Sequence, residues 1–439
     1  MPRPDVPLSA TLPPLVMGTA TFNSQYNPDP YALPTTELVR RALRSGVRAF
    51  DTSPYYGPAE ELLGRALATE SVSTHFPRHK YHLLTKVGRI ASSSFDYTPA
   101  WVRYSVSRSL QRLHTTYLDA VYCHDVEFVT PGEVLQAVRE LRRIRDEEGT
   151  VRYVGISGYP VDVLCGLAEL VLRETGEPLD VVMSYANFTL QNTRLLTQAL
   201  PRLAAAGVDV VPNASPLGMG LLRRSGVPVG SMGDFHPAPA ALRGAILSAA
   251  EWVDAQGEKM EVVAIRFALE SWLRDAGEVG ALGAPLAKSA DADPGFLSVL
   301  NMGTGERLGV SVMGVSTVDE LNETLRVWHS IIEGLENKDE DQQLHTPSVL
   351  TPSEDAITDR AWSHSRRQRI LDLTRQIQDI LGEWVDYVWP SPGPDFVNTL
   401  PDDHVAFKKG LAVSGQDSEP ITPPPETADP KIPVDTPDL

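Results

Sequence analysis

The sequence predicts a (β/α)8 barrel, in which eight parallel strands are each followed by a helix. Short apolar runs alternate with amphipathic helical patterns eight times over roughly 320 residues. Continuous apolar strands, each followed by a helix, indicate a parallel sheet buried on both faces. The chain has 439 residues, enough for one large barrel with additions. The eightfold repeat favours a closed barrel over an open doubly wound sheet.

The expected strands share a short, mostly apolar pattern. In chain order they are PLVMGTATF (14–22), VRAFDTS (47–53), YHLLTKVG (81–88), LDAVYCHDV (118–126), VRYVGISGY (151–159), LDVVMSYANF (179–188), VDVVPNASPLG (208–218) and LGVSVMGVS (308–316).

Amphipathic segments between these runs predict the helices, among them 34–46, 59–70, 98–114, 130–149, 193–207, 261–273 and 318–332. Several helical patterns end at a glycine, the residue that most readily adopts the left-handed conformation of a helix C-cap. These glycines are Gly46, Gly149, Gly176 and Gly207.

Four regions follow from this pattern. The barrel is expected at 12–334, with a long Gly-, Ala- and Asp-rich loop at 275–307. An acidic linker is expected at 335–354 and a helical C-terminal extension at 355–392, which we expect to pack on the barrel rather than on a partner subunit. The extension carries apolar residues at helical spacing: Ile370, Leu373, Ile377, Ile380 and Trp384. The acidic, proline-rich tail at 411–439 is predicted to be disordered.

Composition excludes several classes of function. The formal net charge is −18, which argues against binding nucleic acid or an anionic membrane surface. No apolar run is long enough to cross a membrane, and no signal or transit peptide is evident. The two cysteines, Cys123 and Cys165, cannot build a disulfide framework, and no spacing of metal ligands occurs. A cytoplasmic location is therefore expected.

Polar residues follow successive strands at the end where such barrels carry their active sites. The stretch VRAFDTSPYYG (47–57) places Asp51 at the end of the second strand and Tyr56 five residues later. The other residues at strand ends, from the third strand to the seventh, are Lys86, His124, Ser157, Asn187 and Ser215. The sequence therefore predicts that Asp, Lys, His and Tyr side chains converge at one mouth.

These residue types form a device for proton transfer. A phenol has a pKa near 10, but an ammonium group within about 4–6 Å can lower it by about one to three units. A pKa difference of two units corresponds to about 2.7 kcal/mol. Asp51 would hold Lys86 in place, and His124 would hydrogen-bond the reacting oxygen. Because no side chain supplies or accepts a hydride, a redox cofactor is implied.

The runs DTSPYYGPAEELLGRAL, LLTKVGR, YLDAVYCHDVEF and ASPLGMGLL together resemble the aldo-keto reductase superfamily from about Leu12 to Ile332. The resemblance assigns the family's catalytic tetrad to Asp51, Tyr56, Lys86 and His124. Tyr55 would face the other way on an extended segment and line the substrate rim.

Within the superfamily, YCHDVEF, MSYANFTLQN and VVPNASPLGMGLL look most like the NAD-linked D-arabinose and L-galactose or L-fucose dehydrogenases. The run WVDYVWPSPGP is similar to the fungal D-arabinose members. The resemblance implies oxidation of the anomeric carbon of an aldose to a lactone, with a small-molecule sugar as the partner. Asp125 and Glu127 either bind sugar hydroxyls or cap the next helix.

The resemblance also implies a site for the nicotinamide carboxamide, where Ser157 and Asn187 are the best candidates. The family's usual Ser-Asn pair reads Ser157-Gly158 here, and its usual Gln corresponds roughly to Val182. The family's aromatic stacking residue is replaced by Ala214.

The resemblance implies a pyrophosphate loop that contains Ser215 and Leu217. Backbone N–H groups of Gly218 and Gly220 are expected to approach a phosphate.

The adenine end of the site favours NAD over NADP. The family's NADP-binding members carry a Lys and an Arg where this chain has Val315 and Glu320. A carboxylate there would repel a 2′-phosphate and accept a hydrogen bond from a 2′-hydroxyl. Ser316 could still hold a 2′-phosphate weakly, and Glu323 and Thr324 match the adenine contacts.

Two other functions stay open on the sequence. One is a general aldehyde or ketone reductase that uses NADPH. The other is a non-catalytic, cofactor-sensing binding subunit of the same fold, like the β subunits of potassium channels. The oligomeric state is not determined by the sequence.

Overall fold

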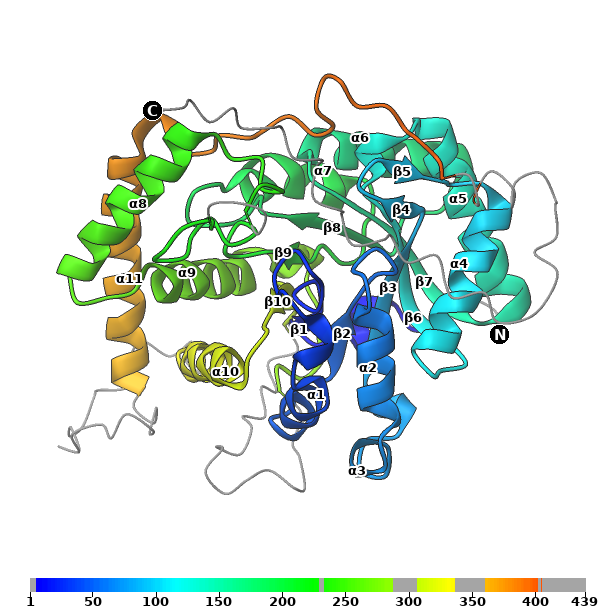
Figure 1. Ribbon diagram of the computed structural model, residues 1–439, viewed down its shortest axis with the longest axis horizontal. Helices are drawn as coiled ribbons and strands as arrows, with labels where there is room; N and C mark the ends of the chain where they lie inside the picture. The colour runs from blue at the N-terminus through cyan, green and yellow to red at the C-terminus, as the bar shows by residue number, and fades with distance from the viewer. Residues whose placement is uncertain (1–4, 229–232, 287–305, 336–359, 402–403, 405–439) are drawn as a thin grey trace, which may run out of the picture.

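A computed structural model describes residues 5–228, 233–286, 306–335, 360–401 and 404. Within them, eight parallel strands form a closed barrel, which confirms the predicted fold class (Figure 1). The strands are β1 (Leu15–Gly18), β2 (Ala49–Asp51), β3 (His82–Val87), β6 (Leu118–His124), β7 (Val151–Gly158), β8 (Val181–Tyr185), β9 (Asn213–Ala214) and β10 (Ser311–Gly314). Each lies inside one of the predicted runs, and β10 pairs with β1 to close the barrel.

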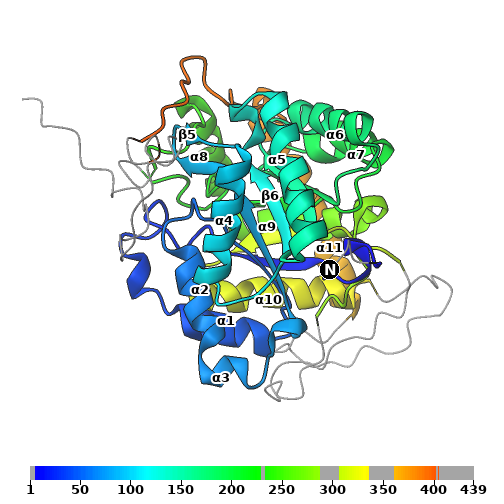
Figure 2. The same ribbon diagram turned by 90° about the vertical axis from the view of Figure 1, so that its right-hand side faces the viewer.

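The helices surround this barrel, and Figure 2 shows α4 and α5 outside strand β6. They are α1 (Thr35–Arg44), α2 (Ala59–Ala68), α3 (Glu70–Ser73), α4 (Pro99–Arg112), α5 (Pro131–Arg143), α6 (Val161–Thr175), α7 (Leu200–Ala205), α8 (Ala240–Ala255), α9 (Met260–Asp275), α10 (Val318–Glu333) and α11 (Arg360–Leu381). The four glycines predicted at helix ends all have positive φ, between 69° and 95°. Because α8 and α9 both follow β9, this repeat contains an additional helix.

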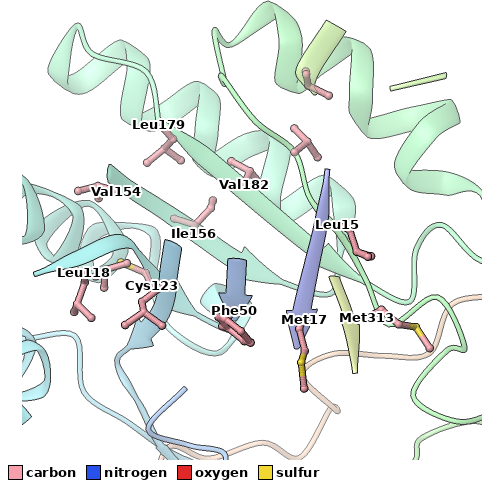
Figure 3. Packing of buried hydrophobic residues seen from close by; sticks show 14 of the residues in the cluster. Leu15, Met17, Phe50, Leu118, Cys123, Val154, Ile156, Leu179, Val182 and Met313 are labelled. Carbon is pink, nitrogen blue, oxygen red and sulfur yellow. The ribbon is translucent and has the colours of Figure 1, made fainter. Parts of the chain in front are cut away.

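Side chains along each strand alternate between the barrel interior and the surrounding helices. Leu84 and Tyr122 belong to the cluster that fills the barrel interior. Cys123 and Val182 belong to the cluster between the strands and the helices (Figure 3). Lys86 lies two residues after Leu84, and His124 lies two residues after Tyr122. The strand period therefore directs both toward the interior at the end where the strands finish, which we call the mouth.

The opposite end of the barrel is closed by the chain itself. Leu8 and Leu12, from the segment before β1, are fully buried among the inward-facing side chains. The hydroxyl of Tyr153, early in β7, donates a hydrogen bond to the Val6 carbonyl at 2.7 Å. This plug leaves the mouth as the end of the barrel available for a site.

The C-terminal extension forms helix α11, which packs against α8 and α9 of the same chain (Figure 1). Ile370, Leu373 and Ile377 are buried there, as their spacing predicts. Ile380 is an exception, because 39% of it is exposed and Leu381 occupies the buried position instead. Each residue of a helix is rotated by 100° from the one before it, so residues four apart lie on nearly the same face. Leu381, four residues after Ile377, therefore continues the buried face.

Several expected regions lie outside the described residues. They are the acidic linker after Leu335, positions 287–305 of the long loop, and the tail at 411–439. The helices that the structure does describe include none with the length and apolar character needed to span a bilayer.

We predict that Ile377→Ala destabilises the fold by about 2–5 kcal/mol, because it leaves a cavity between α11 and α8. Ile380→Ala is the matched control on the same helix, and its effect should stay within about 0.5 kcal/mol since the side chain is largely exposed. Denaturant unfolding of both variants measures the difference. Equal losses of stability would contradict the observed packing of α11.

Candidate active site

Side chains from three strands and one turn come together at the mouth. Asp51 ends β2, Lys86 lies near the end of β3, and His124 ends β6. Tyr56 lies in the turn that follows β2. The Lys86 ammonium is 4.8 Å from the centroid of the Tyr56 ring, and the Tyr56 and His124 ring centroids are 5.6 Å apart. The four residues that the sequence predicts for catalysis therefore share one site.

A buried ion pair forms the floor of this site. Lys86 Nζ donates hydrogen bonds to Asp51 Oδ1 at 2.6 Å and to the Thr52 carbonyl at 2.8 Å. Lys86 is 1% exposed and Asp51 3% exposed, so water screens the pair poorly. Burial raises the pKa of the Asp51 carboxyl above its usual value, although Lys86 acts in the opposite direction.

The pKa of Tyr56 corrects one expectation. Burial raises it well above its ordinary value, Asp51 and Asp125 add to the increase, and Arg89 opposes it. From the sequence we expect Lys86 to lower this pKa. In the structure burial, together with the nearby Asp51 and Asp125 carboxylates, dominates the pKa of Tyr56, and Asp51 lies 2.6 Å from the Lys86 ammonium.

The orientation of Tyr55 also differs from the prediction. Residues 54–58 form a turn rather than an extended segment, so Tyr55 does not face away from Tyr56. Its ring centroid lies 5.8 Å from that of His124, on the same side as Tyr56. Arg89 lies 3.8 Å above the Tyr55 ring and donates a hydrogen bond to its hydroxyl at 3.0 Å.

His124 is held by hydrogen bonds around its ring and its backbone. Ser53 Oγ lies 3.0 Å from Nδ1, and the Tyr97 hydroxyl donates to the His124 carbonyl. Burial lowers the pKa of the imidazole to about 3. The ring is therefore neutral at physiological pH.

Asp125 follows His124 in a left-handed backbone conformation with φ of 55°. It makes no helix cap, and its carboxylate forms an ion pair with Arg89. Burial would raise the pKa of Asp125, but neighbouring positive groups, Arg89 among them, hold it below its usual value.

Glu127 also makes no cap at the start of α5, where Thr130 and Glu133 form the capping box. Its Oε1 accepts hydrogen bonds from the Tyr159 amide at 3.1 Å and from the Ser391 hydroxyl at 3.0 Å. Burial, with Asp125 nearby, raises the pKa of Glu127 to about 8. A Cβ at Gly158 would lie 2.4 Å from Glu127 Oε2, so this carboxylate uses the space where the family's usual Asn side chain would begin.

A segment far along the sequence crosses the mouth. Residues 385–399, the C-terminal strap, run from the end of α11 to the short hairpin of β4 (Arg89–Ala91) and β5 (Ser94–Phe95) (Figure 1). Trp389 stacks on Tyr159 with ring centroids 4.6 Å apart. The side-chain amide of Asn398 accepts a hydrogen bond from the Phe95 amide at 2.8 Å and donates one to the Phe95 carbonyl at 2.9 Å. The strap therefore covers part of the site with aromatic side chains.

The two residues predicted to contact the nicotinamide carboxamide, Ser157 and Asn187, differ in their hydrogen bonding. Ser157 points inward at the mouth, and among the described residues its hydroxyl makes only a long contact of 3.5 Å with the Cys123 carbonyl. The Asn187 amide donates to Ser184 Oγ at 2.9 Å and accepts from Asn192 at 3.1 Å, so it is bonded within the protein. Val182 faces the helices, not the mouth (Figure 3).

The loop after β9 carries the predicted pyrophosphate contacts. Ser215 has φ of 55°, and Gly218 and Gly220 have φ of 56° and 93°. The Gly218 amide donates to the Ser215 carbonyl at 2.8 Å, and the Gly220 amide donates to the Leu217 carbonyl at 3.1 Å. In this conformation both amides are used inside the loop, so their contact with a phosphate stays a prediction.

The predicted adenine-end residues lie at the start of α10. Glu320 forms a capping box with Thr317, and its carboxylate accepts from the Ser316 amide at 2.7 Å. Glu323 pairs with Arg326, and Thr324 is buried. The negative charge of Glu320 is thus fixed beside Ser316.

Sequence reasoning did not identify Ser53 or Arg89. Ser53 lies two residues after Asp51, and Arg89 lies three residues after Lys86. The one sequence feature that could have indicated these two residues is their position close to a strand end. Their partners, His124 and Asp125, are distant in the sequence.

A buried acid–base cluster at the mouth of a (β/α)8 barrel defines the general class, a barrel with a site suited to proton transfer. Comparison with known families then identifies the group: the sequence model of the aldo/keto reductase family matches residues 14–336. The chain belongs to the aldo/keto reductase family.

Two curated relatives share most of their own length with this chain. D-arabinose 1-dehydrogenase of Saccharomyces cerevisiae is 42% identical over 266 residues, which cover 60% of this chain and 77% of the relative. L-galactose dehydrogenase of Arabidopsis thaliana is 36% identical over 234 residues, covering 53% and 68%. Among solved structures, glycerol dehydrogenase from Gluconobacter oxydans aligns with a TM-score of 0.51 at 19% identity over 90% of this chain and 98% of that chain. This structural match supports the fold alone.

We predict that Lys86→Met destabilises the fold by about 3–5 kcal/mol, because Asp51 would remain buried and unpaired. The double variant Asp51→Asn with Lys86→Met should recover much of that loss. Lys80→Met, at an exposed lysine, serves as the control and should have little effect. Chemical denaturation compares the three. A double variant less stable than Lys86→Met would show that the charges are not coupled.

Proposed function

We propose that this protein is an NAD-dependent aldose 1-dehydrogenase that oxidises the anomeric carbon of a D-arabinose-like sugar to the aldonolactone. One observation carries the proposal. The buried cluster of Tyr56, Lys86, Asp51 and His124 occurs in a chain 42% identical to a D-arabinose 1-dehydrogenase.

The residues at the mouth fit a nicotinamide dinucleotide. Ser157 offers an inward hydroxyl with no short hydrogen bond to the part of the chain that the structure describes, and Ser215 lies in the loop after β9. These residues, with Leu217, would hold the nicotinamide and pyrophosphate parts, and Ser316, Glu320, Glu323 and Thr324 would hold the adenosine part. When bound, the oxidised cofactor supplies the hydride acceptor and a positive charge.

The protein's own residues would manage the proton. Tyr56 would accept the proton of the anomeric hydroxyl through its phenolic oxygen. Lys86, held by Asp51, would keep a cation beside the phenol ring as negative charge develops. Neutral His124 would donate a hydrogen bond to the same anomeric oxygen.

The remaining polar groups of the mouth suit a sugar. The Asp125 carboxylate and the Tyr55 hydroxyl, both bonded to Arg89, can accept hydrogen bonds from ring hydroxyls. The fixed Arg89 holds both groups in place, which favours a polyhydroxylated substrate over an apolar aldehyde. These contacts support the sugar class without selecting a stereoisomer.

A general carbonyl reductase is the second candidate, and the raised pKa of Tyr56 favours it. A protonated phenol is the form that donates a proton to a carbonyl. Glu320 argues against the NADPH that such a reductase would use, because the family resemblance would put its charge beside a bound 2′-phosphate.

We predict that the purified protein forms NADH from D-arabinose and that Tyr56→Phe lowers kcat by on the order of 10²–10⁴ while NAD⁺ affinity stays nearly intact. Tyr55→Phe is the matched control and should mainly raise the KM for sugar. A panel of aldoses with NAD⁺, and of aromatic aldehydes with NADPH, separates the two candidates. Near-normal turnover by Tyr56→Phe would exclude its role as the base.

The same site predicts how the rate depends on pH. Because the base must be deprotonated and the pKa of Tyr56 is raised, kcat for oxidation should increase from about pH 6 to about pH 9. No inflection is expected near the usual histidine value, since burial lowers the pKa of His124 to about 3. A rate that falls with rising pH in this range would contradict the assignment.

We predict that Glu320→Gln raises kcat/KM for NADP⁺ relative to NAD⁺ about fivefold, because it removes a repelling charge. Glutamine preserves the capping box of α10, so the helix start should stay intact. Glu323→Gln, one turn further along α10, is the control and should change the ratio less. Steady-state kinetics with both cofactors measure it, and an unchanged ratio would rule out Glu320 as the selecting residue.

A further inference from the structure

The hydroxyl of Ser53 makes two hydrogen bonds in a buried setting. It accepts from the Tyr55 amide at 3.1 Å and lies 3.0 Å from His124 Nδ1, and Ser53 is fully buried. A serine hydroxyl has one proton to donate and two lone pairs. Among the described residues, His124 Nδ1 is the one acceptor within reach of that proton. Ser53 therefore donates to Nδ1, and Nδ1 carries no proton of its own.

The reverse arrangement would leave a buried donor unpaired. If Nδ1 carried the ring proton, Ser53 would accept twice, and its own proton would have no partner among the described residues. A buried donor without a partner loses hydration without compensation, so the arrangement that satisfies both the Ser53 hydroxyl and Nδ1 is the more stable one. The geometry around Ser53 thus selects one tautomer.

The other side of the ring indicates the same tautomer. His124 Nε2 lies 3.6 Å from Asp125 Oδ2, too far for a hydrogen bond but close enough for the carboxylate to attract a proton on Nε2. Arg89 and the left-handed backbone of Asp125 fix that carboxylate in position. Two independent neighbours, Ser53 and Asp125, therefore both favour a proton on Nε2.

The ring has little freedom to reverse. The rings of Tyr55 and Tyr56 meet it edge-on, with interplanar angles of 75° and 89°. The Tyr97 hydroxyl holds the His124 carbonyl. Rotation of the imidazole would break the contact with Ser53 and press the ring against the two tyrosines.

We propose that Ser53 is a positioning residue that fixes His124 in its Nε2–H tautomer, so that His124 presents a hydrogen-bond donor to the reacting oxygen. The identity of that oxygen, the anomeric one of an aldose, rests on the proposed function. The tautomer itself does not.

The tautomer is tested by NMR on the full-length protein labelled with ¹⁵N in its histidine rings. The signals of His124 are assigned by their loss in His124→Gln. We expect the neutral Nε2–H pattern in the wild type and a mixed pattern in Ser53→Ala, in which Asp125 still favours Nε2–H but Ser53 no longer excludes Nδ1–H. An Nδ1–H pattern in the wild type would overturn the proposal, as would an unchanged pattern in Ser53→Ala.

Two further variants separate this role from a loss of structure. Ser109, on α4, is also fully buried, and its hydroxyl has no hydrogen-bond partner among the described residues. Ser109→Ala should therefore leave the His124 pattern unchanged. Ser53→Thr keeps the hydroxyl and should restore the Nε2–H pattern that Ser53→Ala loses. A shift in Ser109→Ala, or no rescue by Ser53→Thr, would count against the specific role of Ser53.

Kinetics give a second readout. Ser53→Ala should lower kcat for aldose oxidation by on the order of 10- to 100-fold with a much smaller change in KM, since the donor is lost at the reacting oxygen rather than at the sugar rim. If the wild type oxidises no aldose, the proposed function fails, and the NMR result still decides the tautomer. If aldoses are oxidised but Ser53→Ala keeps full kcat, the positioning role is wrong while the proposed function stands.

Discussion

The buried ion pair between Lys86 and Asp51 is the interaction on which the rest of the site depends. Neither charge is stable at the mouth without the other, because each has lost its water. The pair joins β2 to β3 and fixes the cation beside the Tyr56 ring. The Asp51 carboxylate of this pair also raises the pKa of Tyr56, in the same direction as burial.

The site at the mouth is also shielded from water. The C-terminal strap stacks Trp389 on Tyr159 and bonds Ser391 to Glu127, so it covers groups that would otherwise be hydrated. In this setting burial lowers the pKa of His124 to about 3, so the ring is neutral and, in the proposed function, would act through a directed hydrogen bond rather than through charge. Ser53 and Asp125, which face its two ring nitrogens, then become important because they decide where the ring proton lies.

Helix α11 and the C-terminal strap, which follow the barrel in the sequence, together cover part of the mouth. The family match ends at residue 336, whereas α11 and the strap lie between 360 and 401. Helix α11 packs on α8 and α9 and delivers the chain to the mouth, where the strap crosses to the β4–β5 hairpin. The part of the chain beyond the family match therefore contributes directly to the surroundings of the barrel site.

The sequence by itself determined the barrel, its eight strands and the inward direction of Asp51, Lys86 and His124. These features follow from local periodicity and from strand ends, which a short window of sequence contains. Only the tertiary structure decided that Tyr55 and Tyr56 face the same ring, that Arg89 pairs with Asp125, and that Ser53 meets His124. Such contacts join residues far apart in the chain, or depend on the path of a turn, and packing rather than local pattern selects them.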